Sequence, residues 1–147
     1  TVRNQANNLY PFLVDTRREL HRHPELGYQE EKTSLLIQQK LDELGIEYTT
    51  GWANNVHSDI FPGTGGYGIV ADIGSGEGPC VLLRADMDAL PILEMTQGID
   101  EFKSINNGKM HACGHDGHTA MLLGAAALLK EKEDTIHGTV RLMFQPA

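Results

Sequence analysis

The sequence predicts an α/β fold in which a mostly parallel sheet is covered by helices on both faces. Short, nearly continuous apolar runs are typical of buried parallel strands, and amphipathic helical segments lie between them. The chain has 147 residues, of which 40% are hydrophobic and 22% charged. This is the composition of one globular domain, and it excludes a disordered, collagen-like or coiled-coil chain.

Three segments carry helical signals. Apolar residues recur at helical spacing over residues 5–22, and Pro24 ends that run because the residue before a proline disfavours the helical region. A second run, over residues 28–44, ends at Gly45, which is typical of a left-handed helix stop. A third helix is predicted over residues 116–132.

Three apolar runs predict strands, over residues 67–73, 80–85 and 138–144. The first two are separated by a Gly-, Ser- and Pro-rich turn, so we expect them to be neighbouring strands joined by a tight connection. The range 51–68 is rich in Gly, Asn and Ser and predicts a loop, with a short strand over residues 56–61 as an open possibility.

Charge and composition exclude several classes of partner. The formal net charge is −8, and the 12 Lys and Arg residues are scattered among acids, which argues against a nucleic-acid binder. No run approaches the roughly 20 apolar residues that span a bilayer. Two cysteines do not form a disulfide framework, and Cys113 lies among histidines, where a thiolate ligand is the better interpretation.

The densest cluster of chemically active side chains occupies residues 111–118, with three histidines, one cysteine and one aspartate. Imidazole and thiolate are preferred ligands of zinc and similar divalent ions. Cys113 and His115 are two residues apart on irregular backbone, where both can face one ion, and His118 follows one helical turn later. The alternative is a capped helix with exposed histidines, with Asp116 as its N-cap.

A second group follows the strand at 80–85, where Asp86 and Asp88 stand at the carboxyl end, the place where open α/β sheets keep their sites. Strand alternation predicts that both carboxylates point to one side. They would then share one ion, or one would bind the ion while the other orients a histidine. An exposed acidic loop is the alternative for this pair taken alone. The histidines at 21–23 are interpreted as a structural corner.

With these motifs in place, the sequence resembles the metal-dependent amidohydrolases that include N-acyl amino acid amidohydrolases, hippurate hydrolases and auxin-conjugate hydrolases, which are relatives of co-catalytic metallopeptidases. Four segments carry the resemblance in the family's order, at residues 18–27, 83–91, 108–122 and 138–147. The resemblance implies the catalytic-domain fold of that family.

The resemblance also implies a chemistry. It implies a site for two divalent ions, Mn²⁺ or Zn²⁺, that hydrolyses the amide bond of an N-acyl amino acid by a metal-activated water. Cys113 and His115 match the family's metal-ligand positions. Asp88 matches a residue that orients a ligating histidine. The roles of Asp86, His118 and the 54–68 loop stay open.

In the family, the motif that ends at Ala147 is followed at once by a glutamate pair that supplies the general base and a further metal ligand. We therefore expect residues 1–147 to form the N-terminal portion of the catalytic domain, with the rest of that domain and a dimerisation domain beyond it. Alone, the chain should bind metal weakly and not hydrolyse amides. We expect its parent to be a soluble homodimer of the cytoplasm or the endoplasmic reticulum lumen. A non-catalytic metal-binding or partner-binding module of the same fold is the alternative.

Overall fold

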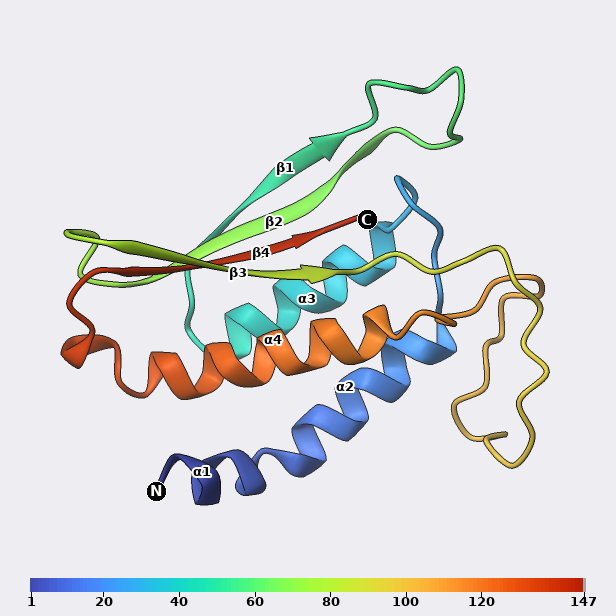
Figure 1. The fold of residues 1–147 in the computed structure, drawn as a ribbon. Coiled ribbons are helices and arrows are strands. Elements are labelled where there is room, and N and C mark those ends of the chain that lie inside the picture. Colours follow the sequence, from blue (N-terminus) through green and yellow to red (C-terminus); the bar gives the residue numbers. More distant parts are fainter. Residues whose placement is uncertain (147) are drawn as a thin grey trace.

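A computed structural model describes residues 1–146 as a four-stranded sheet packed against helices (Figure 1). The helices are α1 (Val2–Asn8), α2 (Tyr10–Arg22), α3 (Glu31–Glu43), α4 (His115–Lys130) and the short 3-10 helix η1 (Glu133–Thr135). The strands are β1 (Tyr48–Asn54), β2 (Gly65–Gly74), β3 (Cys80–Asp86) and β4 (Thr139–Gln145). The predicted α/β class is confirmed.

The strand order is β1-β2-β4-β3, which differs from the predicted sheet in two ways. Only β3 and β4 pair in parallel, because β2 runs antiparallel to both β1 and β4, so the expectation of a mostly parallel sheet is wrong. In addition, the tight turn at 75–79 predicted that β2 and β3 are direct neighbours, but β4 lies between them. The turn joins the two strands across β4 instead. The Ser75 N–H donates to the Gly138 carbonyl just before β4, and the Thr139 N–H, at the start of β4, donates to the Pro79 carbonyl.

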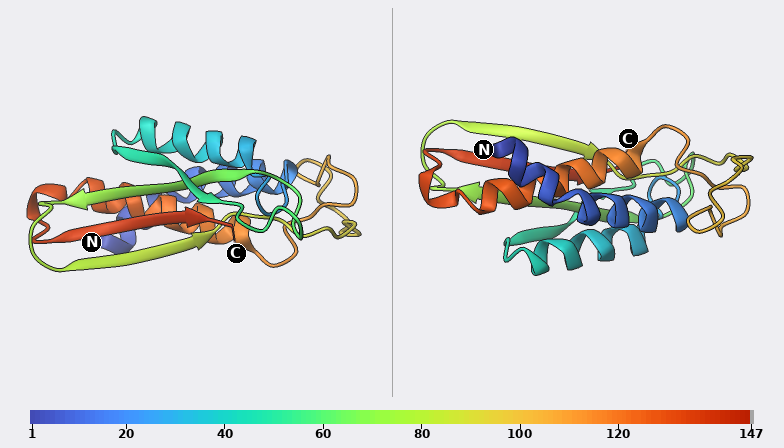
Figure 2. Two further views of the ribbon diagram at one scale, coloured as in Figure 1. Left: turned by 90° about the horizontal axis from the view of Figure 1, so that it is seen from above. Right: turned by 90° about the horizontal axis from the view of Figure 1, so that it is seen from below.

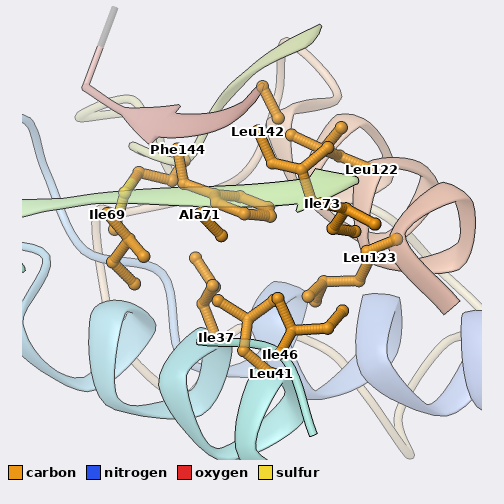
Figure 3. Close-up of a cluster of buried hydrophobic side chains, with 13 residues drawn as sticks. Ile37, Leu41, Ile46, Ile69, Ala71, Ile73, Leu122, Leu123, Leu142 and Phe144 are labelled. Carbon is orange, nitrogen blue, oxygen red and sulfur yellow. The ribbon is translucent and has the colours of Figure 1, made fainter. Parts of the chain in front are cut away.

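The helices lie on one face of the sheet within residues 1–146, whereas helices on both faces were expected (Figures 1 and 2). The core fills the space between this face and helices α3 and α4 (Figure 3). Its fully buried members include Ile37 and Leu41 from α3, Ile69 from β2, Leu123 from α4 and Phe144 from β4. The apolar stripe of each helix is therefore buried against one continuous apolar sheet face.

Element boundaries differ from the sequence expectations where local signals were weak. The first predicted helix is divided at Leu9 into α1 and α2, and Pro11 stands in the first turn of α2. Gly45 has a φ of 66° after α3, as its predicted role requires. The loop at 55–64 contains no strand, and the strand in this region is β1 at 48–54. Cys80, the first residue of β3, is exposed.

Strands β3 and β4 end at the same edge of the sheet, and α4 begins there. Asp86 pairs with Gln145 across the two strands, and the Met87 N–H donates to the Gln145 carbonyl at 2.9 Å. From α4, the Thr119 hydroxyl donates to the Asp86 carbonyl at 3.1 Å. These bonds fix the first turn of α4 against the end of β3, which brings the two predicted groups of site residues together.

The opposite face of the sheet is uncovered within the described residues. Trp52 and Leu82 are 53% and 52% exposed there, and an Arg141–Asp72 ion pair of 2.7 Å crosses β4 and β2. None of the helices formed by residues 1–146 has the length and apolar character needed to cross a membrane.

Candidate metal centre

Three side chains converge where β3 ends and α4 begins. A carboxylate oxygen of Asp86 and one ring nitrogen each of His115 and His118 lie within 4.8 Å of one another. Asp86 is the last residue of β3, and the two histidines occupy the first turn of α4 at i and i+3. Their rings are 5.6 Å apart between centroids, because residues at this spacing share a helix face.

The His115 ring is fixed by Asp88. Its Nδ1 lies 2.9 Å from the Asp88 backbone carbonyl oxygen and 3.1 Å from Asp88 Oδ1. Both atoms are acceptors, so Nδ1 carries the proton and donates it, which leaves the Nε2 lone pair free. This is the arrangement in which an outer carboxylate sets the tautomer and orientation of a metal-binding histidine.

The free Nε2 of His115 lies 3.9 Å from Asp86 Oδ2. Ligand bonds to Zn²⁺ are about 2.0–2.2 Å long for nitrogen and oxygen donors, so two donors on one ion stand about 3–4 Å apart. Imidazole and carboxylate donors suit both Zn²⁺ and Mn²⁺. The donor set of Asp86, His115 and His118 therefore fits a divalent cation. His118 is exposed, so an ion can reach the three side chains from solvent.

The two predicted metal ligands are placed differently. His115 is buried within the three-residue cluster, whereas Cys113 is exposed and, within residues 1–146, belongs to no such group of three. Cys113 immediately precedes Gly114, the N-cap of α4, whose φ of 101° requires a glycine-like conformation. The assignment of Cys113 as a ligand stays a prediction, while Asp86 and His118, left open from the sequence, are brought to His115.

A buried charged network lies behind the cluster. His21, from the end of α2, places Nδ1 2.8 Å from Asp116 and Nε2 2.9 Å from Glu94. Arg17 pairs with the same Asp116 oxygen at 2.8 Å. Glu94 also accepts the Ser104 N–H at 2.7 Å. This network ties the long connection between β3 and α4 to helices α2 and α4, so it holds the frame of the site.

Two pKa values in this region are shifted. Burial alone would raise the pKa of Glu94, but the His21 ring and the Ser104 N–H outweigh it and hold that pKa below its usual value. Burial lowers the pKa of His111 to about 4, so its ring is neutral at physiological pH. Both His111 ring nitrogens are buried without a hydrogen-bond partner among residues 1–146.

Sequence reasoning missed most of this network. His21 was interpreted as a structural corner, and Glu94 stands in a connection without periodicity. These two residues are 73 positions apart, and no sequence signal linked them. Asp116 was weighed as an N-cap, but its side chain contacts Arg17 and His21 while Gly114 occupies the cap.

Known proteins match this chain along its whole length. Residues 82–147, which include the cluster, match the sequence model described as Peptidase family M20/M25/M40. An IAA-amino acid hydrolase, ILR1-like 5 of Arabidopsis thaliana, is 48% identical over 97% of this chain, and N-acetyl-L-cysteine deacetylase of Bacillus subtilis is 48% identical over 100% of it. These comparisons show that the chain is similar to the M20 peptidase family.

A solved M20 structure supports the same conclusion from geometry. The YXEP protein of Bacillus subtilis, described as a dinuclear metal binding peptidase, superposes with a TM-score of 0.79 and 42% identity over 96% of this chain and 36% of its own. The match to the hydrolase and the deacetylase covers 30% and 33% of those proteins. The chain described here therefore spans about a third of the length of these relatives.

Proposed function

We propose that this chain forms the N-terminal, metal-binding portion of the catalytic domain of an amidohydrolase that cleaves N-acyl amino acids. The observation that carries the proposal is the His115 ring, which Asp88 holds with its Nε2 lone pair facing Asp86 and His118. The names of the relatives, which include hydrolases of auxin–amino acid conjugates and of N-acyl-L-amino acids, support the substrate class.

Asp86, His115 and His118 would hold a divalent cation, Mn²⁺ or Zn²⁺, and Cys113 is the further ligand that the family resemblance implies. When bound, such a cation polarises the amide carbonyl and lowers the pKa of a bound water from 15.7 towards about 7. Asp88 keeps the His115 Nδ1 protonated and the ring in place. The buried network of His21 holds the α4 end of the site against displacement.

The general base is proposed to come from residues after Ala147, since β4 ends beside Asp86 at the same edge of the sheet. A dimerisation domain is likewise proposed to lie in the rest of the full-length protein. The full-length protein should therefore be an active homodimer, while the 147-residue chain alone should not turn over substrate.

The test is an assay of the full-length protein with hippurate, indole-3-acetyl amino acids, N-acetyl amino acids and unblocked dipeptides, before and after chelation. We expect hydrolysis of N-acyl amino acids that chelation abolishes and Mn²⁺ or Zn²⁺ restores. His115→Ala should lower kcat/KM at least 1,000-fold, because it removes a ligand that no other described side chain replaces.

His57→Ala is the matched control, since His57 is exposed in the 55–64 loop and carries no motif. Its activity should equal that of the unmodified protein. Cleavage of dipeptides alone would replace the proposed substrate class with carboxypeptidase chemistry. Metal binding without hydrolysis of any of these amides would favour the non-catalytic module.

A further inference from the structure

A buried carboxyl group behind the metal centre has no role in the function proposed above. Glu30 precedes the first residue of α3, and its side chain is completely buried. Its Oε1 accepts the Tyr28 N–H at 2.8 Å, while its Oε2 is buried without a hydrogen-bond partner among residues 1–146. An unpaired buried carboxylate oxygen is costly, so a residue of this kind calls for a specific explanation.

Glu30 and Asp88 both lie against Gly27. A Cβ placed on Gly27 would stand 3.7 Å from Asp88 Oδ2 and 4.0 Å from Glu30 Oε1, so both carboxyl groups border the same glycine. The segment is anchored to the site, because the Ala89 N–H donates to the Glu25 carbonyl at 2.7 Å and Leu26 pairs with Ala89. The position of Glu30 relative to Asp88 is therefore set by backbone bonds.

Asp88 uses Oδ1 to hold the His115 ring, and its other oxygen, Oδ2, is the one near Gly27 and Glu30. We propose that Glu30 is a positioning residue for the metal centre, a neutral carboxylic acid that donates its proton to the Asp88 carboxylate and keeps that carboxylate turned towards His115. The inference rests on the proposed metal-binding function of His115.

The electrostatics of the segment agree with a neutral acid. Burial, with the nearby carboxylates of Asp88 and Glu25 adding to it, raises the pKa of Glu30 to about 7. Two carboxylates in one desolvated place cannot both ionise easily, and the more deeply buried one keeps the proton. Glu30 is completely buried, and its bond from the Tyr28 N–H does not offset that burial, so Glu30 is the one expected to stay protonated.

The test measures Mn²⁺ dissociation constants by calorimetry at pH 6.5 on the full-length protein. Glu30→Leu is expected to weaken binding about 10–100-fold, the usual effect of losing an outer partner of a metal ligand. Glu30→Gln has an uncharged amide that can accept from Tyr28 and donate to Asp88, so it should stay within about twofold of the unmodified protein. Glu31→Gln, at the exposed neighbouring position, is the control and should change nothing.

A double-mutant cycle with Asp88→Asn separates positioning from general stability. If Glu30 acts through Asp88, Glu30→Leu adds less than twofold to the loss already caused by Asp88→Asn. Additive losses, or equal losses in the Gln and Leu variants, would overturn the proposal. Should Glu30→Leu fail to fold, the Glu30→Gln variant alone decides. If Glu30 acted as an ionised carboxylate, the uncharged Gln variant would lose Mn²⁺ affinity, and that result would overturn the proposal. If the unmodified protein binds no Mn²⁺ or Zn²⁺, the proposed function fails rather than this inference.

Discussion

At the scale of single residues, the hydrogen bonds from His115 Nδ1 to Asp88 determine which ring nitrogen of His115 can bind a metal ion. Its Nδ1 faces two oxygens of Asp88, and this alone leaves Nε2 available at the mouth of the site. The sequence suggested the participants, because Asp88 and His115 stand in dense motifs. It did not indicate Glu94, which stands in an irregular connection without periodicity. It did not indicate the burial of Glu30 either, because an acidic residue at the start of a helix is usual there and gives no sign of being buried.

Glu30 makes stability depend on pH in a defined direction. Its pKa is raised to about 7 by burial, so the folded protein binds more protons than the unfolded chain between about pH 4.5 and 7. The stabilisation present below pH 4.5 is lost as the pH rises through 7. Glu30→Gln, which stays neutral, should therefore be more stable than the unmodified metal-free protein at pH 8, by about 1–3 kcal/mol.

At pH 4.5 the two metal-free proteins should unfold at nearly the same urea concentration. Urea unfolding at both pH values measures the difference. A gain that is the same at pH 4.5 and pH 8 would contradict a titrating Glu30.

At the scale of elements, close helix packing depends on one glycine. A Cβ on Gly124 of α4 would lie 2.5 Å from Leu13 Cδ2 of α2. Gly117, one residue before His118 on the same helix, has nothing within 4 Å of its Cβ position. Helix propensity favours Ala over Gly by about 1 kcal/mol at both positions, so only the packing distinguishes them.

Gly124→Ala is expected to lower the free energy of unfolding by about 1 kcal/mol, because overpacking costs about 1–3 kcal/mol and exceeds the gain in propensity. Gly117→Ala should instead raise it by up to about 1 kcal/mol. Chemical denaturation of both variants measures this. A stabilised Gly124→Ala variant would show that Leu13 moves aside without cost.

The elements themselves were largely predictable, and their arrangement was not. The periodicities at 28–44 and 116–132 predicted α3 and α4 within a few residues, since each buries a regular apolar stripe. Strand β1 was missed because its outer residues are mostly exposed and it contains Gly51. The strand order could not be predicted for a different reason. No local signal in β2 or β3 indicates that β4 lies between them.

At the scale of the whole molecule, the two faces of the sheet differ in what they tolerate. Leu142 is completely buried on the helix-covered face, whereas Leu82, beside Arg141 in the register, is 52% exposed on the other. The charged residues Arg141 and Asp72 already occupy that outer face. An added charge should therefore cost little stability on the outer face and much on the helix-covered face.

Leu82→Lys should change the free energy of unfolding by less than about 0.5 kcal/mol, as exposed substitutions usually do. Leu142→Lys places an ammonium group without a partner in the core and should cost several kcal/mol, enough to unfold the chain. Circular dichroism during urea titration of the 147-residue chain checks both. A severe loss in Leu82→Lys would mean that the outer face is covered in solution.

The position of β4 sets the order in which the molecule can be built. The strand that joins β2 to β3 follows both of them in the chain, so a nascent chain that ends before Thr139 contains a β1–β2 hairpin and a β3 with no partner in the described sheet. Every pairing that completes the sheet is distant in sequence, which slows folding. Asp86, at the end of β3, therefore has its strand partner Gln145 only after β4 has been synthesised, and the edge of the sheet beside α4 forms only then.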